Sequence, residues 1–82
     1  MNSEKLFQLL HNIHEERYRV DVLKDVKLFE SNLAKDLEIN VEDAMAMLGY
    51  LLKKKYAKIE SGKGIVVNQD NQDIQQLFKS KL

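Results

Sequence analysis

The chain has 82 residues, carries 13 Lys and Arg against 13 Asp and Glu, and contains no cysteine and no proline. This length suits one small domain, the apolar and charged fractions of 44% and 32% are typical of a globular protein, and the lack of cysteine excludes a disulfide scaffold and a cysteine-ligated zinc site. No apolar run approaches the roughly 18 residues of a membrane span, and the N-terminus lacks the basic and long apolar segments of a signal peptide, so we expect one cytoplasmic domain over residues 1–82 without membrane contact.

The first predicted element is an amphipathic helix over about residues 3–16. Ser3 is a suitable N-cap. Apolar residues recur along the segment at helical spacing, namely Leu6, Leu9, Leu10 and Ile13. His11 and His14 lie three residues apart on this helix, but a metal site needs a third ligand and usually an i, i+4 pair. We therefore predict no metal site here.

Residues 18–28 carry two conflicting patterns. Apolar and polar residues alternate from Tyr18 to Val22, as in a half-buried strand, whereas Val22 and Val26 also fit a helical period. We expect an irregular connection that ends in a short strand at residues 26–28.

Two helices joined by a short turn are predicted next, over about residues 30–37 and 41–54. Leu33, Ala34 and Leu37 form a short apolar face on the first of them. Asn40 is a strong N-cap for the second, and Asp43 three residues later resembles a capping box.

The helix predicted at 41–54 has one apolar and one mixed face. Ala44, Leu48 and Leu51 fall on one line, flanked by Val41, Met47 and Leu52, and this side is expected to point inward. Met45 stands at the margin between the faces. The residues expected to point outward are Glu42, Asp43, Ala46, Gly49, Tyr50 and Lys53.

A hairpin over about residues 56–68 and a last helix over about 71–81 complete the chain. Gly62 and Gly64 supply the positive φ that a tight turn needs. The last helix carries an apolar stripe of Ile74, Leu77, Phe78 and Leu82. This stripe either packs on the first helix or pairs with a second copy, and we favour a homodimer because a domain this small gains much from added burial.

The order of these elements resembles the winged helix-turn-helix superfamily. Residues 33–40 (LAKDLEIN) are similar to the family's helix and turn, and residues 48–59 (LGYLLKKKYAKI) are similar to the recognition helix and its exit into the wing. The resemblance implies an α+β, mainly α fold in which the terminal helices pack together or form a dimer interface. Glu38 and Lys55 depart from the pattern, because glycine is common at both positions and a left-handed non-glycine residue costs about 1 kcal/mol.

The resemblance also implies a function, namely duplex DNA binding by a small transcriptional regulator. The helix at 41–54 would enter the major groove, and the wing would contact the phosphates. The residues carried over to DNA binding are Met45, Ala46, Gly49, Tyr50, Lys53, Lys54, Lys58 and Lys63.

The charge pattern fits this function only in part. Residues 30–43 hold five acidic residues against one lysine, a net of −4, and residues 53–63 hold five lysines against one glutamate, a net of +4. Glu42 and Asp43 would be repelled by phosphates, although acids also stabilise a helix N-terminus, and no arginine on the helix can contact guanine. The alternatives are a winged helix used for protein contact, without DNA binding, or a mixed surface that is merely solvated.

No pattern predicts an enzyme. The sequence has no nucleophile elbow, and the turn at residues 61–64 is too short for a nucleotide loop and leads into a strand. We therefore expect no catalytic residues and no cofactor.

Overall fold

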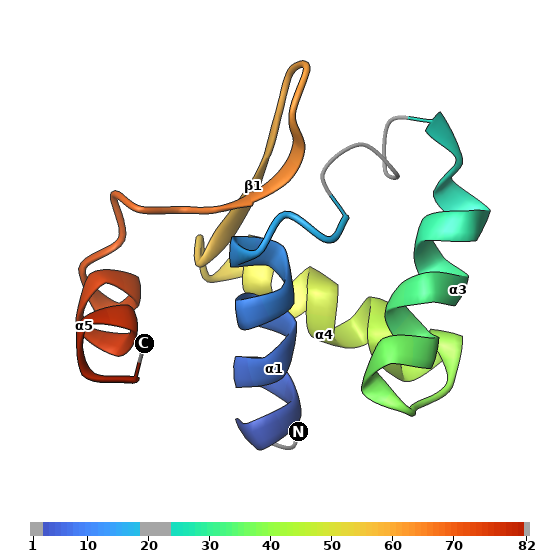
Figure 1. Ribbon diagram of the computed structural model, residues 1–82, viewed down its shortest axis with the longest axis horizontal. Helices are drawn as coiled ribbons and strands as arrows, with labels where there is room; N and C mark the ends of the chain where they lie inside the picture. Colours follow the sequence, from blue (N-terminus) through green and yellow to red (C-terminus); the bar gives the residue numbers. More distant parts are fainter. Residues whose placement is uncertain (1–2, 19–23, 82) are drawn as a thin grey trace.

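The computed structural model describes residues 3–18 and 24–81. Within them, three helices precede a two-stranded antiparallel hairpin and one helix follows it, a mainly helical layout compatible with a winged helix. The elements are α1 (Ser3–His14), α3 (Val26–Leu37), α4 (Val41–Lys53), β1 (Ala57–Glu60), β2 (Gly64–Val67) and α5 (Gln72–Lys81). Figure 1 shows α1 at the centre, α3 and α5 on opposite sides of it, and the hairpin rising above α4.

One hydrophobic core joins all of these elements. The apolar lines predicted for these helices are buried in it, including Ala44, Leu48 and Leu51 on α4, except that Leu6 on α1 is half-buried at its edge. The hairpin adds Ile65, and α5 adds Ile74. The inward line predicted for α4 is therefore confirmed, together with its flank Met47, whereas the flanks Val41 and Leu52 are exposed, at 40% and 37%, and the prediction for them was wrong.

The start of α3 corrects the sequence prediction. The strand expected at residues 26–28 is wrong, because this segment is the first turn of α3, four residues before the predicted start of that helix. Asp25 caps the helix, its Oδ1 accepting a hydrogen bond from the Leu28 N–H at 3.1 Å. Val26 and Leu28 are about half exposed, and Phe29 is the first buried side chain of α3. Residues 19–23 of the expected irregular connection lie outside the described residues.

Local signals set the two ends of α4. The Oδ1 of Asn40 accepts a hydrogen bond from the Asp43 N–H at 2.7 Å, as an N-cap does. The last helical residue is Lys53, and Lys55 then adopts a φ of 62°. Glu38, before the turn, has a φ of 56°. Both positions where the winged helix pattern favours glycine are thus left-handed in this chain.

The hairpin and α5 close the fold. Gly62 and Gly64 have the positive φ predicted for the turn, at 80° and 83°. Asn71 precedes α5, and its Oδ1 accepts a hydrogen bond from the Asp73 N–H at 2.8 Å. Its Nδ2 donates to the Lys55 carbonyl, which ties α5 to the end of α4.

The apolar stripe of α5 contributes to the core of its own chain. Ile74 is only 1% exposed, and Leu77 packs against the core from its edge. The dimer surface predicted from Ile74, Leu77, Phe78 and Leu82 therefore loses Ile74, because that side chain already has intrachain partners. The side chains of Phe78 and Leu82 lie outside the described part of the structure.

Candidate functional site

The solvent-facing side of α4 carries four of the eight residues predicted to bind DNA, namely Met45, Ala46, Gly49 and Lys53. We call this surface the outer face of α4. It consists of Val41, Glu42, Asp43, Met45, Ala46, Gly49, Leu52 and Lys53, of which Met45 is half-buried and the others are exposed. Val41 and Leu52 are large apolar side chains that remain 40% and 37% exposed. The middle of this face is thus apolar, with acids at its start and a lysine at its end.

Gly49 lies at the centre of the outer face, where neither steric contacts nor backbone conformation require a glycine. A Cβ built at this position meets no atom within 4 Å, and the residue is exposed. A glycine in a helix interior is about 1 kcal/mol less favourable than alanine. Neither intrachain packing nor a positive φ accounts for that cost, since only Gly62 and Gly64 among the glycines have positive φ.

Tyr50 lies at the edge of this face rather than fully outside. It is half-buried and packs against the core, with its ring centroid 6.3 Å from that of Tyr56 in an edge-to-face arrangement. The Lys54 Nζ lies 5.9 Å from the centroid of the Tyr50 ring, within the range of a cation–π contact. Tyr50 therefore offers only part of its ring to a partner.

The two hairpin lysines share one glutamate. The Lys58 Nζ lies 3.4 Å from Glu60 Oε1, and the Lys63 Nζ lies 3.6 Å from Glu60 Oε2. The hydrogen bond from Lys58, with the nearby charge of Lys63, lowers the pKa of Glu60 below its usual value. Glu60 therefore stays ionised at neutral pH and offsets part of the positive charge that the wing would present to phosphates.

The predicted site residues consequently form two groups. Lys58, Glu60 and Lys63 line a cleft of about 330 Å³ beside the end of α1, which His14 and Asp70 also line. No residue that lines this cleft comes from α4. The other group lies on α4 and its C-cap, from Met45 to Lys54. Lys53, Lys54 and Lys55 are exposed at the end of α4 and make no ion pair with the described residues.

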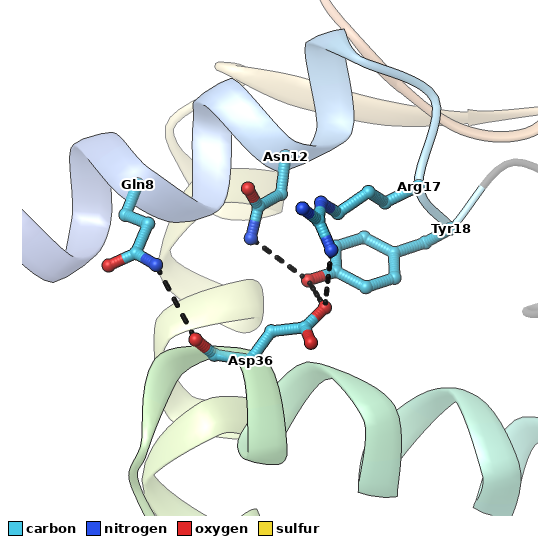
Figure 2. Close-up of polar contacts among 5 residues, drawn as sticks. All are labelled: Gln8, Asn12, Arg17, Tyr18 and Asp36. Atoms are coloured by element: carbon cyan, nitrogen blue, oxygen red, sulfur yellow. Dashed lines mark hydrogen bonds and ion pairs between the residues drawn. The ribbon is translucent and has the colours of Figure 1, made fainter.

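A polar network joins α1 to α3 (Figure 2), with Asn12 and Tyr18 buried, Asp36 half-buried, and Gln8 and Arg17 exposed. The Tyr18 hydroxyl accepts a hydrogen bond from Asn12 Nδ2 at 3.2 Å and donates one to Asp36 Oδ2 at 2.9 Å. Arg17 lies 3.7 Å from the same carboxylate oxygen, and Gln8 donates to the Asp36 carbonyl. Burial and the hydrogen bond to Asp36 raise the pKa of Tyr18 to about 12. Sequence reasoning missed this cluster, because its tyrosine and its aspartate are 18 residues apart.

Tyr18 serves packing rather than chemistry. The residue is 1% exposed, and its ring lies edge-to-face against Phe29 with centroids 5.7 Å apart. A substrate cannot reach a hydroxyl that is closed off in this way. The network therefore links α3 to α1 and to the turn that follows α1.

The described residues contain no group of three or more metal-ligating His, Cys, Asp or Glu side chains. His11 lies 3.9 Å from Glu15, one turn along the chain. In the described part of the chain, every helix is too short or too polar to cross a membrane.

Comparison with known proteins yields no relative. No family model matches the chain, and no curated protein and no solved structure matches it. The function is therefore inferred from the site alone.

Proposed function

We propose that this protein is a small winged-helix module that binds a protein partner through the outer face of α4. One observation carries this proposal: the exposed middle of α4 is apolar and small, while its first turn is acidic. Ala46 and Gly49 leave the helix backbone open to close approach, and the exposed Leu52 beside them offers apolar area that a partner would bury.

The same surface is a poor match for the phosphate backbone. Glu42 and Asp43 stand at the helix end that would approach DNA, and their charges oppose phosphate. The hairpin offers little compensation, since Glu60 is paired with both Lys58 and Lys63. Protein contact avoids these costs because a protein partner can supply basic groups opposite the acids.

Duplex DNA binding is the second candidate, and one observation favours it. Lys53, Lys54 and Lys55 are exposed next to the base of the hairpin and have no ion-pair partner among the described residues. Three such lysines are able to hold phosphates and to give binding that weakens steeply as salt rises. In that function α4 docks in the major groove and the protein acts as a transcriptional regulator.

A single substitution separates the two functions. Ala46→Arg places a long cation at the centre of the outer face and keeps a good helix former. If the face binds protein, this variant loses the association that the wild-type chain shows with its partner. The loss is read as a fall in sedimenting mass if the partner is a second copy, or as the disappearance of an equimolar copurifying protein if it is a different chain. If the face binds DNA, the added charge tightens retention on mixed-sequence duplex at about 20 mM salt, where screening is weak.

Ser31→Arg is the matched control, because Ser31 is exposed and lies on α3, a different helix from the one that carries the outer face. We expect this control to keep the partner, and neither wild type nor control to be retained on duplex. Retention that falls steeply with salt and is strengthened by Ala46→Arg would replace protein contact with DNA binding as the function of this face.

A further inference from the structure

Four exposed residues of α4 form a straight line along the outer face. At about 100° per residue, Glu42, Ala46, Gly49 and Lys53 fall within about 60° of one another around the helix axis. All four are exposed. The line therefore reads acid, small, small, base from the N-terminal to the C-terminal end of α4.

This line is complementary to itself when it is reversed. If two copies of α4 cross antiparallel with a two-fold axis between positions 47 and 48, Glu42 faces the partner's Lys53 at each end. At the centre, Ala46 faces the partner's Gly49. Such an arrangement is isologous, since each contact occurs twice. A parallel arrangement would instead set Glu42 against Glu42.

The residues beside the line suit a helix partner. Met45 and Leu52 flank it on one side, and both are apolar and at least partly exposed. Their side chains would be covered by a second helix that approaches closely over the small residues. Close approach is also a reason for the glycine, because Gly49 is exposed in a helix interior and no intrachain contact requires it.

We propose that the partner of the outer face of α4 is a second copy of this chain, bound through an antiparallel α4–α4 contact. This inference rests on the protein-contact function proposed above and names its partner. The charge pairing between Glu42 and Lys53 sets the antiparallel direction, and Ala46 and Gly49 set the distance of approach. The contact replaces the dimer predicted from α5, whose Ile74 is buried within its own chain.

The first test adds bulk at the crossing point. A Cβ at position 49 meets nothing within 4 Å inside the chain, so Gly49→Leu leaves the monomer folded and improves its helix propensity. Sedimentation equilibrium at protein concentrations from about 10 μM to 1 mM covers the range of a weak contact. We expect it to show a dimer of the wild-type chain. Gly49→Leu should weaken self-association by at least about tenfold. Ser31→Leu, which adds the same side chain on α3, should leave it unchanged.

The second test exchanges charges. Glu42→Lys and Lys53→Glu should each weaken self-association, since each brings like charges together at both ends of the contact. An equimolar mixture of these two variants should form a heterodimer, because every lysine then faces a glutamate. The double variant Glu42→Lys/Lys53→Glu should self-associate as the wild type does. Lys27→Glu, an exposed change on α3, is the control for net charge.

Two results would overturn the inference. One is a wild-type chain that stays monomeric up to about 1 mM, the highest concentration of the sedimentation experiment, because its dissociation constant would then lie above that value. The other is a dimer that persists in Gly49→Leu or does not respond to the charge exchange. If the pure chain is monomeric while Ala46→Arg still removes a different copurifying protein, the inference fails and the proposed function stands. If the wild-type chain neither dimerises nor copurifies with another protein, both the inference and the proposed function fail.

Discussion

Removing the Tyr18 hydroxyl tests whether the polar network of Tyr18, Asn12 and Asp36 holds α1 and α3 together. Tyr18→Phe keeps the ring that lies edge-to-face against Phe29 and deletes only the oxygen that bridges Asn12 and Asp36. A hydrogen bond to a charged group contributes about 1.5–3 kcal/mol, and a buried amide left without its partner costs about 1–3 kcal/mol. Asn12 is buried, so part of the second cost applies as well.

We therefore expect Tyr18→Phe to lower the free energy of unfolding by about 2–3 kcal/mol. For a domain of this size each kcal/mol shifts the melting temperature by about 4–8 °C. Urea unfolding followed by circular dichroism at pH 7 measures the change. Tyr56→Phe is the matched control, because Tyr56 is half-buried and its hydroxyl makes no hydrogen bond to the described residues.

The raised pKa of Tyr18 predicts that the protein loses stability at high pH. The pKa of Tyr18 is about 12 in the folded protein against 10.0 for an unperturbed tyrosine, since burial and Asp36 disfavour the phenolate. The folded state therefore holds this proton more tightly than the unfolded state. The resulting stabilisation is fully present below pH 10 and is lost as the pH rises through about 12, a change of about 2–3 kcal/mol.

Tyr18→Phe lacks this titration. The difference in unfolding free energy between wild type and variant should accordingly shrink between pH 10 and pH 12. A variant that loses less than about 0.5 kcal/mol, the range of ordinary surface substitutions, and follows the wild-type pH profile would refute the reasoning. Such a result would mean that the hydroxyl stays hydrated and that packing alone positions α3.

Two further predictions concern the turns around α4. Lys55 has a φ of 62°, so Lys55→Gly should raise the free energy of unfolding by up to about 1 kcal/mol in urea titrations. Lys53→Gly, a control within the helix, should lower the free energy of unfolding by about 1 kcal/mol. If both variants lose stability, the left-handed conformation of Lys55 carries no strain. Asn40→Ala removes the cap on the Asp43 N–H and should cost about 1 kcal/mol, whereas Asn40→Asp should keep most of the stability. Equal losses in both Asn40 variants would indicate that the amide acts through another contact.

Much of the helix and turn structure could be predicted from the sequence, because helix periodicity, capping and turn signals depend on residues that are close together in the chain. The burial of Leu33, Leu48 and Leu51 follows from helical spacing alone, and Asn40 begins α4 as its capping side chain suggests. The turn glycine Gly62 has the positive φ that its place between two strands requires. Each of these features depends on residues within about one or two turns of one another.

Segments with two plausible periods were not decided in this way. Residues 26–28 fit both an extended and a helical pattern, and helix formed because Asp25 caps it and Phe29 reaches the core. The burial of Ile74 likewise depended on where α5 packs, which the stripe itself left open. A short apolar pattern does not specify which surface will cover it.

The sequence by itself determined the order of the helices and the hairpin and the inward line of α4 formed by Ala44, Leu48 and Leu51. Only the tertiary structure decided that the Tyr18 hydroxyl bonds to Asp36, that Ile74 is buried within its own chain, and that a Cβ added at Gly49 would meet no atom of a neighbouring element within 4 Å. The physical reason is that periodicity and capping act between near neighbours, whereas the charge a surface offers and the partners of a buried group depend on how the finished elements pack.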